Sequence, residues 1–597
     1  MRLRDNIILV VCLLLAAILF FSSGMCLDYI NSQRQQMKLV SNEPLQNAPP
    51  SLAFATVAMG AFRGLVVDIL WMRADRLKQE GQFFDAKQLA DWITTLQPRF
   101  ATVWEFQAWN MAYNISVAIP ASQPQERWRW VKNGYELLRD QGIPLNPKSI
   151  LLYRELARIF QHKLGAVSDD AHKYYKIQLA SAMEPLLGPA NNEYFESLAK
   201  TPADWQQILK DPNIAQLIGA LKSADKVFAT EADFVSNYLA LRQTPNKFDP
   251  NAFKVIDYYR NTQALKDFDI FAKAYQLRNV WKLDPVLMLE LNKLYGPTDL
   301  SDPDKHIPLD WRHPDCHAIY WAIKGLRTAG KIGAQKGVRK EYSADEVNTD
   351  RIVAHSLQNL FINGKIFIYR SPVTKEASLQ GMPRQEDDIF LRPDFRMYVA
   401  YDTAIRAIIE KYTDPNDKQM NSHQIGHMNM LRDSVLMFYQ AGHLRQAEKL
   451  YNELRTLYPK DDFKVPLVVF ARKKMKEELS AMVINDTKQM IGMLLSESYF
   501  RYSLRDDDEA FNREKWVLEI YKQYNEANPA ENRIDLPDIK IMKYLALIDF
   551  LADEEYPMVL RQSLIGRIKI ERPDLFKQLE QQEEMLRKQA EQAQNPK

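Results

Sequence analysis

Residues 81–98, GQFFDAKQLADWITTLQP, decide the predicted fold of this chain. Gly81 is followed five residues later by Ala86, and Pro98 comes twelve residues after that alanine. Small residues let two helices approach closely, and proline ends a helical run because it has no backbone donor. We therefore predict a helical hairpin here. A second copy is predicted far along the chain, because the same two intervals recur in Gly442, Ala447 and Pro459.

The composition of the 597 residues favours a folded, helix-rich protein. Lys and Arg number 78 and Asp and Glu 76, so the net charge of +2 argues against a nucleic-acid-binding protein. Three cysteines exclude a disulfide-based scaffold. Only 20 glycines are present, fewer than turn-rich β-sandwiches or glycine-loop nucleotide folds need. We expect an all-α protein with no cofactor.

Large and small residues follow the prolines at matching offsets. Trp104 and Ala108 come six and ten residues after Pro98, and Tyr153 and Ala157 keep these offsets after Pro147. With these spacings the sequence resembles tetratricopeptide-repeat proteins over about 66–165 and 428–460. The resemblance implies an α-solenoid whose concave groove binds a protein or peptide. The candidate groove residues on the first helices are Trp104, Asn110, Tyr113, Asn114, Tyr153 and Arg154.

A second resemblance covers most of the chain. Stretches such as FRGLVVDILWMRA (62–74) and DWRHPDCHAIYWA (310–322) look like those of uncharacterised bacterial membrane-anchored proteins with repeat-like bodies. This resemblance implies a location at the cell envelope and brings no known activity.

The N-terminus carries a candidate membrane anchor. Residues Ile7 to Phe21 are an unbroken apolar run that extends to Leu27, long enough for a transmembrane helix. Arg2 and Arg4 precede it, which predicts a cytoplasmic N-terminus and a periplasmic body. A cleaved signal peptide is the alternative.

A second apolar stretch, Leu52 to Met72, contains Arg63 and Asp68. Both charges are costly inside a bilayer, so we expect this stretch to be the first buried helix of the body. If it instead spanned the membrane, the body would be cytoplasmic.

Composition divides the chain into consecutive segments. Within 360–369, LFINGKIFIY, an Asn-Gly pair between β-favouring residues predicts a small β-hairpin. A basic loop is predicted before it, at 324–340. The predicted segments are an anchor at 1–27, a linker at 28–50, a TPR-like block at 51–190, an irregular helical extension at 191–310, a mixed segment at 311–400, a second TPR-like block at 401–572 and a polar tail at 573–597.

Two histidine pairs are weak candidates for a metal site. His313 and His317 flank Cys316, and His423 and His427 lie four residues apart, a spacing that places both on one face of a helix. Gln424 stands where a zinc protease has its glutamate base, so the hydrolytic motif is incomplete. Two ligands do not make a site, and we predict no metal.

We predict a non-enzymatic, membrane-anchored scaffold that binds a protein partner in an envelope or transport complex. A metal-dependent envelope enzyme using the two histidine pairs is the alternative. A membrane-bound solute receptor is a third, and it requires a closed small-molecule pocket.

Overall fold

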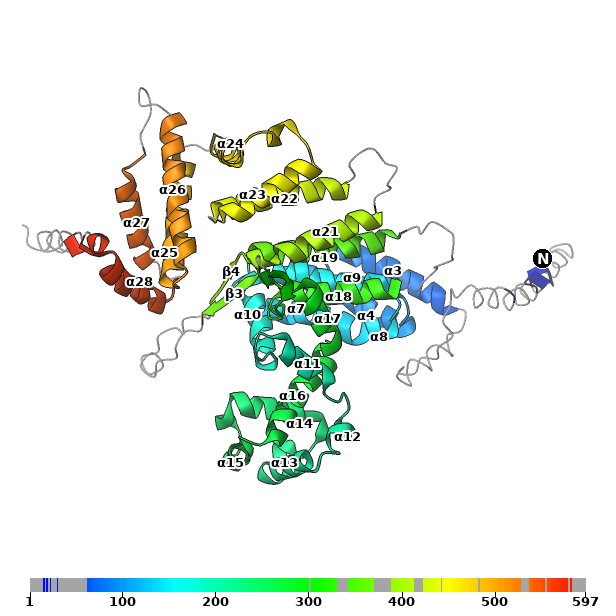
Figure 1. Ribbon diagram of the computed structural model, residues 1–597. Helices are drawn as coiled ribbons and strands as arrows, with labels where there is room; N and C mark the ends of the chain where they lie inside the picture. Colours follow the sequence, from blue (N-terminus) through cyan, green and yellow to red (C-terminus); the bar gives the residue numbers. More distant parts are fainter. Residues whose placement is uncertain are drawn as a thin grey trace, which may run out of the picture. The chain divides into compact units, whose positions relative to one another are not determined.

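The protein is described by a computed structural model, drawn in Figure 1. The described residues are 14–16, 18–19, 22, 29, 62–299, 302–329, 342–369, 388–412, 422–441, 443–480, 484–527, 536–552, 556–577 and 580–581. The predicted linker therefore lies outside them apart from Tyr29, as do most of the predicted anchor and polar tail.

The fold is mostly helical and repeat-like, as predicted. The chain divides into two compact units, the first made of residues 1–111 with 136–147 and the second of residues 112–135 with 148–597. The predicted 51–190 block is thus shared between both units.

The first unit is built around a pair of helices. Its core contains Val67 and Ala74 on the first helix and Ala86, Ala90 and Ile93 on the second. Its helices are α3 (Phe62–Gln79), α4 (Phe83–Leu96), α5 (Ala101–Trp109), the π-helical segment η2 (Leu138–Gly142) and α8 (Ile143–Leu145). The label η marks π-helical and 3-10 helical segments throughout.

The turn between α3 and α4 explains the first predicted motif. Gly81 has φ +77°, a left-handed conformation that favours glycine. The N–H of Gln82 donates to the carbonyl oxygen of Leu77 at 2.8 Å, which closes the helix end. Ala86 follows four residues after Gln82 and is fully buried. The hairpin predicted from these residues is present.

The turn between α22 (Ser422–Gln440) and α23 (Leu444–Leu457) has the same pattern. The N–H of His443 donates to the carbonyl oxygen of Phe438 at 2.9 Å, again across five residues. Ala447, four residues later, is also fully buried. The second predicted hairpin is therefore present, although Gly442 lies outside the described residues.

A third hairpin, which the sequence did not indicate, joins α25 (Ile484–Ser503) to α26 (Asp507–Ala527). The N–H of Asp506 donates to the carbonyl oxygen of Arg501 at 3.0 Å, and Ala510 is 4% exposed at the equivalent position. Arg505 holds the left-handed position with φ 62°. The motif was missed because arginine replaces the glycine.

The second unit contains the remaining described helices. Its N-terminal and middle helices are η1 (Asn110–Ile115, which begins in the first unit), α6 (Ser116–Ala118), α7 (Pro124–Leu137, which ends in the first unit), α9 (Ile150–Arg158), η3 (Ile159–Gly165), α10 (His172–Met183), η4 (Glu184–Leu186), α11 (Asn192–Lys200), α12 (Trp205–Ile208), α13 (Pro212–Ala224), η5 (Lys226–Phe228), α14 (Glu231–Gln243), η6 (Pro245–Lys247), α15 (Pro250–Tyr259), α16 (Gln263–Gln276), η7 (Leu277–Trp281), α17 (Pro285–Tyr295), α18 (Pro314–Ala329), α19 (Ala344–Asn363), η8 (Phe395–Met397) and α21 (Tyr398–Tyr412). The later helices, besides those of the two hairpins, are η9 (Asp461–Phe463), α24 (Leu467–Ser480), α27 (Ile539–Ala552) and α28 (Met558–Glu571).

Glycine also permits a close contact between α9 and α18. A Cβ atom added at Gly325 would lie 2.6 Å from the Cβ of Tyr153, closer than side chains approach. The backbone of α18 therefore packs directly on Tyr153. This contact joins helices that are far apart in the sequence.

The predicted β-hairpin at 360–369 is corrected by the structure. Helix α19 continues to Asn363, because Leu357, Leu360 and Phe361 are buried at helical spacing. The Asn-Gly pair ends this helix and closes no turn. Residues Lys365–Tyr369 do form a strand, β3, but it pairs in antiparallel fashion with β4, Asp388–Arg392.

A second short ladder joins β1 (Thr298–Asp299) to β2 (Asp302–His306), in antiparallel fashion. It leads directly into the segment that precedes α18.

No helix among the described residues is both long and apolar enough to cross a membrane. Helix α3 covers the end of the predicted buried helix at 52–72, and residues 52–61 lie outside the described part. Of the predicted basic loop, only 324–329 is described, and it continues α18.

Candidate functional site

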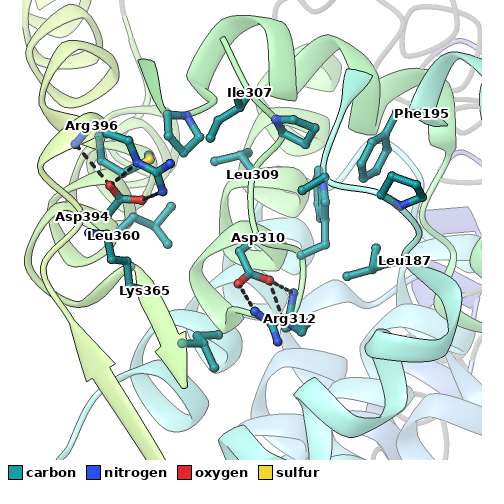
Figure 2. Close-up of a pocket in the computed structure, with 18 of the residues that line it drawn as sticks. Leu187, Phe195, Ile307, Leu309, Asp310, Arg312, Leu360, Lys365, Asp394 and Arg396 are labelled. Carbon is teal, nitrogen blue, oxygen red and sulfur yellow. Dashed lines mark hydrogen bonds and ion pairs between the residues drawn. The ribbon is translucent and has the colours of Figure 1, made fainter. Parts of the chain in front are cut away.

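A cavity of about 600 Å³ lies where the links between several helices meet (Figure 2). Its walls come from the η4–α11 link, the segment between β2 and α18, the end of α19 and the start of η8. This volume falls within the usual range for ligand sites. The lining residues are Glu184, Leu187, Gly188, Pro189, Ala190, Phe195, Pro297, Ile307, Pro308, Leu309, Asp310, Trp311, Arg312, Leu360, Gly364, Lys365, Ile366, Asp394, Arg396 and Met397.

One wall carries an ion pair within the sequence Asp-Trp-Arg. The Nε of Arg312 donates to Oδ1 of Asp310 at 2.9 Å, and Nη2 donates to Oδ2 at 2.7 Å. The backbone N–H of Arg312 also donates to Oδ1, at 3.1 Å. A bidentate contact plus a backbone bond fixes the guanidinium plane.

The other wall carries the same arrangement in Asp-Phe-Arg. Arg396 donates from Nε to Oδ1 of Asp394 at 2.8 Å and from Nη2 to Oδ2 at 2.7 Å. Its backbone N–H donates to the same Oδ1 at 3.2 Å. In Figure 2 the two ion pairs flank Leu309 and Leu360. The cavity therefore has two positioned guanidinium groups with aliphatic side chains between them.

Buried contacts hold both segments in place. Asn292 on α17 is fully buried, and its Oδ1 accepts from the N–H of Leu309 at 3.1 Å and from Nε1 of Trp311 at 2.9 Å. On the other side, the N–H of Asp394 donates to the carbonyl oxygen of Phe361 at 3.0 Å. The two Asp–Arg turns are thus attached to the helical core.

The charges of the lining cancel. The hydrogen bond and charge of Asp310 raise the pKa of Arg312, and those of Asp394 raise the pKa of Arg396, so both stay protonated. Three cationic side chains face three acidic ones: Arg312, Arg396 and Lys365 against Asp310, Asp394 and Glu184. Such a lining favours an uncharged ligand with apolar groups and hydrogen-bond acceptors over a free anion.

The predicted groove residues of the first unit are enclosed. Trp104 is 4% exposed, and its Nε1 donates to the carbonyl oxygen of Pro98 at 2.8 Å. Asn110 is fully buried, and its Nδ2 donates to the carbonyl oxygen of Phe83 at 2.9 Å. Both side chains fix the packing of α5 and do not face an open groove.

The predicted groove residues of the second unit are dispersed. Tyr113 and Asn114 are half-buried, with Tyr113 beside His162 at a ring separation of 5.8 Å. Tyr153 is buried under α18. Arg154 forms ion pairs with Asp345 and Glu155. None of the four lines the cavity of Figure 2.

The first histidine pair lies in a buried cluster. His313 accepts from the N–H of Asp315 at Nδ1, and its Nε2 lies 3.2 Å from the carbonyl oxygen of Asn363, so the ring is the neutral Nε2–H form. Burial lowers the pKa of His313 to about 4. His317 Nε2 lies 3.0 Å from the carbonyl oxygen of Trp311. Both rings are engaged by the backbone.

The neighbouring carboxyl of Asp315 is unusual. It is fully buried, and burial raises its pKa to about 7. Asn359 donates to Oδ1 at 3.1 Å, whereas Oδ2 has no hydrogen-bond partner among the described residues. Lys176, 1% exposed, interacts electrostatically with this carboxyl, and burial lowers its pKa to about 8. Sequence reasoning missed this pair because the two residues lie on different helices.

The second histidine pair is split. His427 is buried and bridges Tyr458 Oη, 2.7 Å from Nδ1, and Asp402 Oδ1, 2.8 Å from Nε2. His423 instead stacks on Tyr412 with a ring separation of 5.6 Å. Across the described residues, no group of three or more His, Cys, Asp or Glu side chains is placed to hold a metal ion.

One sequence pattern is shared by the two cavity walls, but it did not lead to a prediction of the site. Asp-Trp-Arg and Asp-Phe-Arg each precede a helix start, where aspartate commonly bonds to the backbone two residues later. Two copies of this short pattern give no indication that they meet, because that depends on how α18, α19 and α21 pack.

No protein-family model and no curated protein matches the chain. Among solved structures, a circular tandem repeat protein with novel repeat topology and enhanced subunit contact surfaces is 12% identical over 91% of this chain and 97% of that chain, with a TM-score of 0.14. At that score the similarity carries no argument about this chain, so the helical repeat-like fold rests on its own three hairpin turns.

Proposed function

We propose that this protein is a non-enzymatic interaction scaffold and that the cavity of Figure 2 binds a segment of a partner protein. The main support is that the guanidinium groups of Arg312 and Arg396, each bound to an aspartate, lie on opposite walls of one cavity. Aspartate takes the Nε hydrogen and one Nη2 hydrogen of each guanidinium, so Nη1 and the second Nη2 hydrogen are the donors that can face a ligand.

An extended peptide matches this lining. Its carbonyl oxygens accept from guanidinium groups without adding charge, and an apolar side chain fits the space near Phe195, Ile307 and Leu309. The net neutrality of the wall disfavours a multiply charged ligand. We further propose that the hairpins belong to the tetratricopeptide type and that residues 1–27 anchor the chain, with the body in the periplasm.

Site-specific photocrosslinking tests the partner. A benzophenone amino acid at Ala190, an exposed lining residue, is expected to give one reproducible protein adduct in cells that contain the full chain. The same group at Tyr258, 82% exposed on α15, is the control and is expected to give none of it. The adduct is expected to disappear in an Arg312→Gln/Arg396→Gln variant.

Arg242→Gln is the matched control variant, because Arg242 also pairs with an aspartate, Asp269 at 3.2 Å, but lies outside the cavity. An adduct that forms equally from positions 190 and 258, or that survives the double substitution, would contradict the proposal. A reporter enzyme fused after Lys597, active only outside the cytoplasm, tests the proposed orientation.

The cavity volume also supports a second candidate, a solute receptor. Native mass spectrometry of the purified full chain separates the two. A small molecule that co-purifies, and is lost in the Arg312→Gln/Arg396→Gln variant, favours the receptor over the scaffold.

A further inference from the structure

Helix α3 has two apolar faces, and only one of them is used inside the protein. Val67 is 1% exposed and Ala74 is fully buried, on the face that packs against α4. On the opposite face Leu65, Ile69 and Met72 are 59%, 53% and 64% exposed. We call these three residues the α3 stripe.

The α3 stripe follows the period of the helix. Steps of four and three residues keep its members within an arc of about 60°, and Arg76, four residues further, falls on the same line. The side chain of Arg76 is 79% exposed, although it forms an ion pair with Glu80 at 2.8 Å. The stripe is therefore an apolar strip about 10 Å long, and Arg76 follows on the same line about 16 Å from its start.

Charges of both signs flank the stripe, and its C-terminal end has Arg73, Arg76 and Lys78 together with Asp75 and Glu80. Arg73 is exposed beside Met72, whereas Asp68 is exposed beside the N-terminal half. An apolar strip with arginines at its edge is the pattern of a helix that lies in a membrane interface, where long basic side chains reach the phosphates.

The position of α3 in the sequence supports the same occupant. Residues 52–61, LAFATVAMGA, are uncharged and directly precede α3. The apolar run Ile7 to Phe21 lies further upstream. The stripe thus belongs to the part of the chain that the proposed anchor would keep near a bilayer.

We propose that the α3 stripe rests on an anionic bilayer surface, with Arg73 and Arg76 at the phosphate level. This inference builds on the proposed membrane attachment and adds a second contact that orients the first unit. The other occupants of an apolar face, a protein segment or a second copy of the chain, are outcomes of the test below.

Spin-label accessibility distinguishes these occupants. Nitroxides are placed at Ile69→Cys and Met72→Cys in the full chain carrying Cys12→Ser and Cys26→Ser, since Cys316 is fully buried. The protein is reconstituted in nanodiscs of phosphatidylcholine and phosphatidylglycerol. Collision rates with oxygen, which concentrates in lipid, and with a water-soluble nickel chelate are then measured. Gln88→Cys, exposed on α4, is the matched control.

We expect labels at 69 and 72 to collide often with oxygen and rarely with nickel, and the label at 88 to show the reverse. High nickel access at 69 and 72 would overturn the inference, and so would low access to both agents, which marks a protein contact. An Arg73→Glu/Arg76→Glu variant is expected to raise nickel access at 72. If the chain does not associate with nanodiscs at all, the proposed anchor fails as well; if it associates but both labels are in water, only the stripe inference fails.

Discussion

The hairpin turns and the cavity walls both contain segments that link one helix to the next, but these segments are stabilised in different ways. The three hairpins share a backbone bond across five residues, and the first and third also have a residue with positive φ in the turn, Gly81 and Arg505. The cavity walls use side chains: an aspartate binds the following arginine and the backbone before each helix. The hairpin turns are closed by the backbone alone, whereas the Asp–Arg turns leave charged side chains on the surface of a cavity.

The hairpin turns have a structural role, whereas the Asp–Arg turns also place polar groups in a cavity. The hairpin turns bury alanine and place no polar group in a concave site, so they fix the spacing of helices. The Asp–Arg turns keep hydrogen-bond donors at a cavity wall, and α18, which follows the first of them, carries the buried Asp315, to which Asn359 on α19 donates. The middle of the chain is therefore where substitutions and pH are expected to act most strongly.

The largest effect is expected from Asp315→Asn. The pKa of this carboxyl is raised from 3.8 to about 7, so the folded state keeps a proton that the unfolded chain releases. The stabilisation is full below about pH 4 and is lost as the pH rises to about 7, at about 1.4 kcal/mol per pH unit. The lowered pKa of His313 acts in the opposite direction over a similar range in both proteins, so the difference between them is the quantity to measure. In urea unfolding, the free energy of unfolding of the wild type minus that of the variant is expected to fall with pH at that rate. Asp461→Asn, at an exposed aspartate, is the control and should keep the wild-type slope.

The next effect concerns His427, the member of the second histidine pair that is buried. His427→Ala is expected to lower the free energy of unfolding by about 2–3 kcal/mol, because Asp402 and Tyr458 lose their shared partner. His423→Ala is expected to cost less, about 1 kcal/mol, since His423 is less buried than His427 and stacks on Tyr412.

A metal site would behave differently. Equal losses in the two histidine variants, together with a lower melting temperature of the wild type in EDTA, would support the metal-dependent alternative and contradict the structural role of His427.

Much of the fold could be predicted from short intervals between residues in the sequence, whereas most of the site could not. Ala86 and Ala447 could be placed in helix contacts because close packing demands a small residue at a fixed distance from a turn. The stretch 360–369 was misinterpreted because Asn-Gly ends a helix as readily as it turns a hairpin. Asp310 and Asp394 gave no warning of a common cavity, since their meeting depends on contacts far apart in the sequence.

A smaller effect is expected at the contact between α9 and α18. Gly325→Ala places a Cβ 2.6 Å from that of Tyr153, so the helices must separate, at a cost of about 1–3 kcal/mol. Gly492→Ala in α25 is the matched control, because no atom lies within 4 Å of its added Cβ. It is expected to raise stability by about 0.5–1 kcal/mol through helix propensity. Thermal unfolding of both variants measures the difference, and equal signs would disprove the close contact.

The smallest effect tests whether the third hairpin is a true copy of the first. Arg505 adopts φ 62°, a strained conformation for any residue with a Cβ, where the first hairpin has Gly81 at φ 77°. Arg505→Gly is therefore expected to raise the free energy of unfolding by about 0.5–1 kcal/mol, after the greater entropy of glycine in the unfolded chain is subtracted. Gly81→Ala is expected to lower it by a similar amount. Arg505→Lys retains the charge near Glu571 and should change little, so a gain in this variant equal to that of Arg505→Gly would assign the effect to side-chain contacts and not to the turn.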